Sequence, residues 1–129
     1  MAIFLTFSAG LSTAVFADQK DPRLDALFSA LKLSDTQETS RILESQIWTI
    51  WHIPPAGSES GYVLRDGIEA MSSGRVDDAL EAFDKVTKLE PDFAEGWNKR
   101  ATVFYMLGDL DRSVLDIQRT LVLEPRHFG

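Results

Sequence analysis

The sequence contains no cysteine among its 129 residues and only two histidines, His52 and His127. A chain without cysteine forms no disulfide, offers no thiolate metal ligand and carries no lipid on sulfur. Neither histidine has a second ligand at a metal-binding spacing, and the sequence holds no nucleophile motif and no glycine-rich phosphate loop. These absences predict that the protein has no catalytic, cofactor-binding or metal-binding residues. They also predict that it is not an enzyme. The alternative is an active site in sequence beyond Gly129.

Basic residues are fewer than acidic ones, 13 against 20, which gives a net charge of −7. An acidic chain is repelled by nucleic acid and by anionic membrane surfaces, so we expect neither as a partner. The hydrophobic fraction of 44% is ordinary for a folded globular chain, and the length is that of one domain.

Charge is missing altogether from residues 1–17, which are rich in leucine, isoleucine and phenylalanine. The run is shorter than the roughly 20 residues that cross a bilayer as a helix. It resembles the hydrophobic part of a secretory signal peptide, with Val15 and Ala17 as the small residues before a cut at Ala17-Asp18. The sequence therefore predicts a secreted or periplasmic protein with no integral membrane segment after signal removal. The alternatives are a buried N-terminal helix of the mature protein and a start codon placed too late.

The next segment, residues 18–53, is expected to form a helical hairpin. Four apolar residues at helical spacing predict a first helix over residues 22–32: Leu24, Leu27, Phe28 and Leu31. Ser34 stands three residues before Gln37, which is the spacing of a capping box, and the second helix is expected to end at Pro54.

The second helix of this hairpin has a broad apolar face that includes Trp48 and Trp51. We expect that face to cover Leu64 and Ile68 of the helix that follows, so that the hairpin acts as an N-terminal cap. An aromatic ligand site is the alternative. Residues 54–60, with two prolines, a glycine and two serines, are the predicted linker.

One pattern occurs twice in residues 61–129, at a spacing of 34 residues. The first copy contains Gly74, Ala79, Phe83, Leu89 and Pro91, and the second has Gly108, Ser113, Ile117, Leu123 and Pro125 at the corresponding places. A period of this length indicates a helical repeat array. We expect helix pairs at 61–73 with 76–89 and at 94–107 with 110–123.

The copies resemble the tetratricopeptide repeat, whose signature runs W-x2-L-G-x2-Y, then A-x3-F, then P. The matches are Trp97, Ala101, Phe104 and Pro125 in the second copy and Gly67, Ala79, Phe83 and Pro91 in the first. Arg100 stands where the signature has leucine, and Val63, Asp66 and Ala70 also depart from it. The resemblance implies an all-α fold, a right-handed α-α superhelix of antiparallel helix pairs. Its units are 61–93 and 94–127, and we expect the array to be cut short before a third.

The pattern also has a physical basis. Gly67, Ala79, Ala101 and Ser113 are small where antiparallel helices approach closely. Gly74 and Gly108 fall between the helices of a pair, where a left-handed conformation that glycine adopts easily is common. Asp77, Asp78, Asp109 and Asp111 are expected to cap or flank the next helix start rather than to act as general acids or bases.

The resemblance further implies that the first helix of each pair lines a concave surface where peptides bind. The second copy would present Asn98, Thr102, Tyr105 and Met106 there, with Lys99 at the edge; the first would present Leu64, Ile68 and Met71, with Arg65 at the edge. The amide of Asn98 can pair with a peptide backbone. Arg65, Lys99 and Arg100 would hold a carboxylate, although the paired Lys/Asn pattern of the family's clamp is absent. A solvated or packing role for each of these residues is the alternative.

These observations predict a protein-protein interaction scaffold that binds a partner peptide or protein through its concave face, without cofactors. The alternative is a self-associating structural array with no peptide ligand, a homo-oligomer joined through its last helix. That helix keeps Val114, Ile117 and Leu121 with no polar helix after it.

Overall fold

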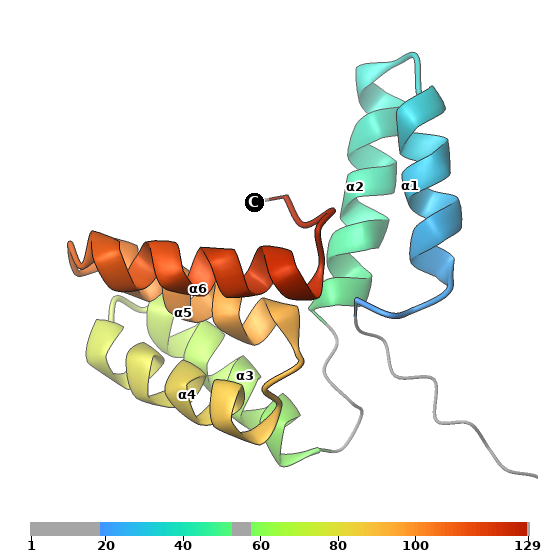
Figure 1. The fold of residues 1–129 in the computed structure, drawn as a ribbon. Coiled ribbons are helices and arrows are strands. Elements are labelled where there is room, and N and C mark those ends of the chain that lie inside the picture. The colour runs from blue at the N-terminus through green and yellow to red at the C-terminus, as the bar shows by residue number, and fades with distance from the viewer. Residues whose placement is uncertain (1–18, 53–57, 129) are drawn as a thin grey trace, which may run out of the picture.

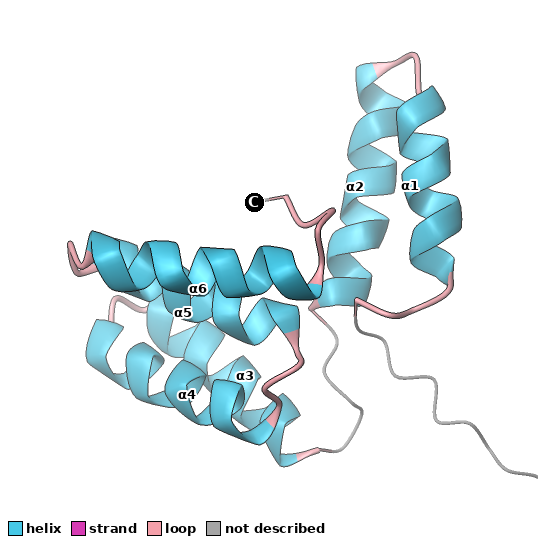
Figure 2. Cartoon of the chain, viewed as in Figure 1, coloured by secondary structure: helices cyan, strands magenta, loops and turns pink. Residues whose placement is uncertain are grey.

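A computed structural model describes residues 19–52 and 58–128, and every regular element in these ranges is a helix (Figures 1 and 2). In chain order they are α1 (Arg23–Leu33), α2 (Gln37–Trp51), α3 (Glu59–Ser72), α4 (Val76–Leu89), α5 (Ala94–Met106) and α6 (Leu110–Leu123). The all-α prediction is confirmed. The predicted bounds of α4 and α6 are those observed, and the others differ by one to three residues. None of these helices is long and apolar enough to cross a membrane.

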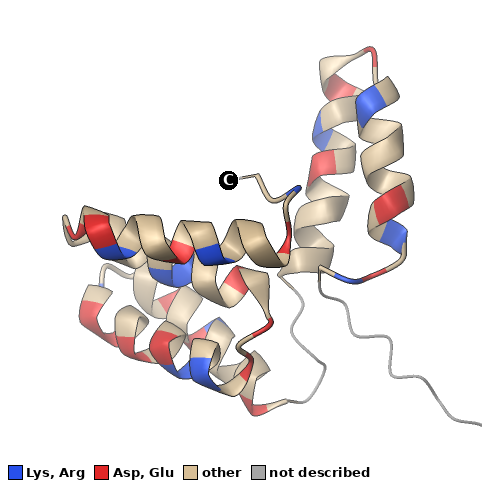
Figure 3. Cartoon of the chain, in the orientation of Figure 1, with Lys and Arg blue, Asp and Glu red and all other residues tan. Residues whose placement is uncertain are grey.

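Helices α3 to α6 lie side by side, each antiparallel to the one before it, as expected for stacked helix pairs (Figure 1). Helices α1 and α2 form a separate hairpin that stands crosswise at one end of the stack. Acidic side chains lie on both parts of the molecule (Figure 3). The structure thus has two bodies, the repeat pairs α3–α6 and the hairpin α1–α2.

The turns inside the two pairs are the same. Gly74 and Gly108 have φ angles of 73° and 77°, in the left-handed region that glycine adopts without steric cost. The N–H of Arg75 then donates to the carbonyl of Ala70 at 2.9 Å, and that of Asp109 to the carbonyl of Phe104 at 2.9 Å. These bonds satisfy carbonyl groups at the helix ends, so the glycine prediction is confirmed.

Close approach within each pair depends on the small residues that the repeat pattern singles out. A methyl group added at Gly67 would lie 2.7 Å from Cε1 of Phe83, so any larger residue there would force its neighbours to shift. In the second pair, the hydroxyl of Ser113 donates to the carbonyl of Ala101 at 2.9 Å. One apolar core then runs from α3 to α5: Leu64, Ala70, Ala79, Phe83, Val86, Phe93 and Val103.

Two details of the predicted helix starts are wrong. Thr36, not Ser34, caps α2, because its hydroxyl accepts from the N–H of Thr39 at 3.2 Å. The hydroxyl of Ser34 instead donates to the carbonyl of Leu31, at the end of α1. At α3, Ser58 is the cap and the helix begins at Glu59, so the last residues of the predicted 54–60 linker belong to the helix. Residues 53–57 and the predicted signal peptide, residues 1–17, lie outside the described ranges.

The aspartates at the pair turns behave differently from one another. Asp109 caps α6 by accepting from the N–H of Arg112 at 3.1 Å, as expected. The corresponding N-cap of α4 is Arg75, which makes no side-chain cap bond. Asp78 in the first turn of α4 forms an exposed ion pair with Arg75 at 2.9 Å.

The hairpin does not cover the first repeat pair as the sequence suggested. Leu64 belongs to the core of α3, α4 and α5, with Ile68 packed against it. Trp51 instead forms a second apolar cluster with Leu24, Ile47 and Ile50, to which Trp48 and Phe128 are added. Phe128 follows α6, so the hairpin packs on the end of the last repeat rather than on the start of the first.

Candidate functional site

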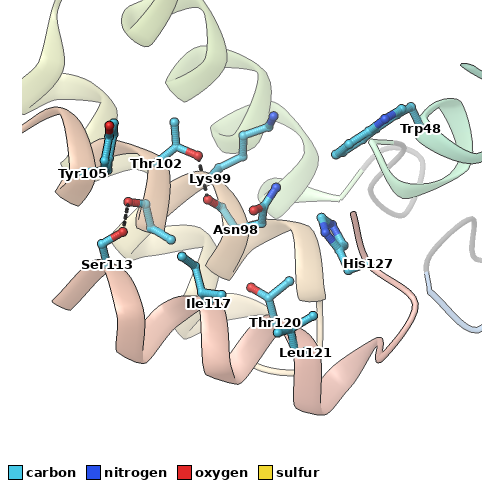
Figure 4. A pocket seen from close by; sticks show the side chains of 11 residues that line it. Trp48, Asn98, Lys99, Thr102, Tyr105, Ser113, Ile117, Thr120, Leu121 and His127 are labelled. Atoms are coloured by element: carbon cyan, nitrogen blue, oxygen red, sulfur yellow. Dashed lines mark hydrogen bonds between the residues drawn. The ribbon is translucent and has the colours of Figure 1, made fainter. Parts of the chain in front are cut away.

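A groove of about 460 Å³ runs between α5 and α6 and ends against the hairpin (Figure 4). We call it the α5/α6 groove. Its lining is Asn98, Lys99, Ala101, Thr102 and Tyr105 from α5, Ser113, Ile117, Thr120 and Leu121 from α6, Trp48 from α2 and His127 from the C-terminal segment. The groove is therefore built by both bodies of the molecule.

The wall from α5 is polar and ends in an aromatic ring. Asn98, Thr102 and Tyr105 are spaced four and three residues apart, which places them on one face of the helix. The hydroxyl of Thr102 donates to the carbonyl of Asn98 at 3.0 Å, and Nδ2 of Asn98 donates to Oε2 of Glu95 at 3.0 Å. Tyr105 is 68% exposed, so its ring stands open to a ligand.

The wall from α6 presents aliphatic side chains, with Ile117 and Leu121 each 43% exposed. The polar groups beside them already have partners. Thr120 donates to the carbonyl of Asp116 at 2.9 Å, and Ser113 donates to that of Ala101. Because these hydroxyls are satisfied internally, the surface that this wall offers to a ligand is mainly apolar.

A buried carboxylate lies where the groove meets the hairpin. The side chain of Glu95 is 1% exposed, and its Oε2 accepts from Asn98 and lies 3.1 Å from Nε2 of His127. Nζ of Lys99 and Nε2 of His52 lie 3.0 and 3.1 Å from Oε1, close enough for charge attraction but without the alignment of a hydrogen bond. Four groups thus converge on this carboxylate: Asn98 and Lys99 of α5, His52 at the C-cap of α2, and His127 after α6.

Burial raises the pKa of Glu95, but the hydrogen bond from His127 and the charges of Lys99 and His52 outweigh it. The pKa therefore lies below its ordinary value, and the group is a carboxylate at neutral pH. The ring of His127 also stacks on that of Trp51, with centroids 4.3 Å apart and an interplanar angle of 9°. These contacts fix the hairpin at the end of the groove.

Four of the seven predicted binding residues line the groove: Asn98, Lys99, Thr102 and Tyr105. Met106 is 49% exposed just beyond it. Arg65 and Met71 lie on α3, where Arg65 forms an exposed pair with Asp66 at 3.3 Å and Met71 packs against the core. Their role in binding stays a prediction.

Two of the predicted cationic groups already face carboxylates of the chain itself. Lys99 is held by Glu95, as described. Arg100 donates from Nε and Nη2 to the two oxygens of Asp116, at 2.8 and 3.0 Å, and from Nη1 to Asp84 at 2.7 Å. The side chain of Arg100 is 16% exposed, so it joins α4, α5 and α6 rather than presenting its charge to a partner.

Trp48 and His127 are groove residues that the main sequence prediction did not place in a binding site; for Trp48 an aromatic ligand site was the alternative. Trp48 was expected to cover α3, and His127 carried no motif. Their place follows from the docking of the hairpin, for which the local sequence has no signal. Within residues 19–52 and 58–128, no group of three or more His, Asp or Glu side chains is arranged to hold a metal ion.

Comparison with known proteins gives one curated relative, a TPR repeat-containing protein from Rhizobium etli. It is 36% identical over 108 residues, which are 83% of this chain and 52% of the relative. The chain thus spans about half the length of that protein. No protein-family model matches the chain, and no solved structure matches it significantly.

Proposed function

Because the chain belongs to the tetratricopeptide-repeat family, we propose that it is a protein-protein interaction scaffold that holds a segment of a partner protein in the α5/α6 groove. The observation that carries this proposal is the composition of the groove walls. Exposed Tyr105, Ile117 and Leu121 provide apolar contact area, and Asn98 provides a polar group beside them. Grooves that bind proteins combine aromatic or aliphatic anchors with a few placed hydrogen-bonding groups.

The partner is a protein rather than a nucleic acid in this proposal. The chain carries a net charge of −7, and Lys99, the lysine that lines the groove, faces the carboxylate of Glu95. Phosphate backbones are bound by clustered lysine and arginine. The role assigned to the groove is binding, not catalysis.

Selection of segments from a displayed peptide library tests the proposal. The selected segments are synthesised, and their affinity is measured by fluorescence anisotropy. Replacing Asn98 and Tyr105 together by alanine is expected to weaken binding by about a hundred-fold, because an aromatic anchor and a hydrogen-bonding amide are both lost.

The matched control is Tyr62→Ala, which removes an exposed tyrosine from α3, away from the groove. It should leave the affinity unchanged, and circular dichroism should show the same helicity for all variants. Equal affinity of the double variant and the unmodified chain would reject the groove as the binding site.

A second candidate function is a structural one, self-association of the array through α6. The observation in its favour is the exposure of apolar side chains along that helix, among them Leu110, Val114 and Ile117. Surfaces of this kind are uncommon on monomeric proteins and mark interaction sites.

We also propose that the protein acts outside the cytoplasm, which rests on the uncharged apolar run at residues 1–17 and the small residues before Asp18. N-terminal sequencing of the protein purified from its producing cells tests this. A mature chain that starts at Asp18 is the expected result, and an intact Met1 would overturn it.

A further inference from the structure

Helix α6 carries a seam of apolar side chains that the other described residues cover only in part. Leu110, Val114, Ile117 and Leu121 are 57, 50, 43 and 43% exposed. Their spacing of four, three and four residues is that of the a and d positions of a coiled coil. A face with this spacing packs along another helix rather than against an extended peptide.

The first repeat pair shows what packs on the corresponding face of α4, because its residues match those of α6 at the 34-residue period. Ile117, Thr120 and Leu121 correspond to Phe83, Val86 and Thr87 of α4, which are 0, 0 and 4% exposed. Helix α5 buries these residues of α4, since Val103 shares their core and a methyl group added at Gly96 would lie 2.9 Å from Val86.

The α5/α6 groove is therefore the counterpart of the seat in which α5 lies on α3 and α4. In that seat α5 runs antiparallel to α4 (Figure 1). A helix that continues the same packing on α6 would run antiparallel to α6.

We propose that the occupant is α6 of a second copy of the chain, seated antiparallel in the α5/α6 groove of the first. A two-fold axis perpendicular to α6 and close to its midpoint relates the two copies, and this symmetry makes their α6 helices antiparallel. Among the described helices, α6 presents the longest exposed apolar seam, so it is the helix of this chain able to fill such a seat. The proposal rests on the groove being a docking surface, as proposed above.

The symmetry fixes the register. Val114 of one copy meets Ile117 of the other, and Leu110 meets Leu121. At the seam edges Ser113 lies near Thr120, and Asp111 near Gln118, whose amide can donate to the carboxylate. Although the chain carries a net charge of −7, this pairing sets no two like charges against each other across the seam.

Sedimentation analysis of the full chain over a range of concentrations tests the association. The unmodified chain is expected to shift from monomer to dimer. Val114→Lys, which places an ammonium group in the seam, should weaken association about ten-fold or more. Leu115→Lys is the matched control, because Leu115 is a 62% exposed leucine of α6 that lies off the seam. A chain that stays monomeric at all concentrations, or equal weakening by the two variants, would overturn the proposal.

The absence of cysteine allows the direction to be tested by cross-linking. A mixture of Leu110→Cys and Leu121→Cys chains should form a mixed disulfide under mild oxidation. Either variant alone should not, because antiparallel pairing separates identical positions by about 16 Å along the helix. Efficient cross-linking of a single variant with itself would contradict the antiparallel register.

The outcomes separate this proposal from partner recognition. Val114 does not line the groove, so a Val114→Lys monomer that still binds the selected segments leaves recognition standing. A dimer that forms while the Asn98 and Tyr105 replacements leave segment affinity unchanged keeps self-association and removes recognition.

Discussion

At the scale of single residues, the size of facing side chains differs between the two pairs. Gly67 lies against Phe83 in the first pair, whereas the second pair has Ala101 and Ile117 at the corresponding places. The ring of Phe83 would have to shift to make room for a methyl group at position 67. The two pairs thus solve the same close approach with different combinations of residues.

Gly67→Ala is expected to lower the free energy of unfolding by about 1 kcal/mol. Overpacking costs about 1–3 kcal/mol, and alanine returns about 1 kcal/mol through its helix propensity. Adding Phe83→Ile reproduces the combination of the second pair, so the double variant should be more stable than the sum of the two single changes implies. Urea unfolding of the four chains measures this coupling, and strict additivity would contradict the packing argument.

At the scale of helices, the local signals of the sequence were enough for the repeat pairs. Gly74 and Gly108 mark the ends of α3 and α5 because the left-handed turn needs them, and the apolar spacing marks α4 and α6. The groove wall of α5 was predicted from the resemblance to the tetratricopeptide repeat, whose first helices line the concave face. The network around Arg100 did not, because the sequence shows only that the residue departs from the signature. Its partners Asp84 and Asp116 lie on other helices, at no spacing that the signature records.

Arg100 holds three helices together, and its pKa is raised, chiefly by the hydrogen bonds to Asp116 and despite burial. Arg100→Leu restores the apolar residue of the repeat signature but leaves the buried carboxylate of Asp116 without its partner. We expect a loss of about 3 kcal/mol or more in the free energy of unfolding. Arg75→Leu, which breaks an exposed pair with Asp78, should cost less than about 1 kcal/mol. Thermal and urea unfolding compare the two, and similar losses would show that the network adds little.

At the scale of the whole molecule, the position of the hairpin depends on contacts that no local pattern encodes. The rings of Phe28 and Phe128 lie 6.4 Å apart, from opposite ends of the chain. The side-chain amide of Gln19 also bonds to the backbone at Asp92 and Ala94. Sequence periodicity predicts the helices of a repeat array and the order in which they pack. It carries no information on where a hairpin outside the repeats will pack.

The Glu95 junction makes this arrangement sensitive to acid. Because the pKa of Glu95 is lowered from 4.5, the unfolded chain binds the proton more readily than the folded one. The carboxylate therefore contributes its full stability at pH values above 4.5, the pKa of the unfolded chain. This contribution is lost as the pH falls through the lower pKa that Glu95 has in the folded chain. Glu95→Gln should therefore be less stable than the unmodified chain at pH 7 and should lose less on going to pH 3. Urea midpoints across this range check the prediction, with the exposed Glu81→Gln as control; parallel curves for all three chains would refute it.

The packing of the α1–α2 hairpin against residues that follow α6 also sets the order of events during synthesis on the ribosome. Arg126 bonds to Asp25 across 101 residues of sequence. Since a chain emerges from its N-terminus onward, α1 and α2 must wait until residues 124–128 have been translated before they reach their final place. The repeats can close first, and the earliest helices made are the last to settle.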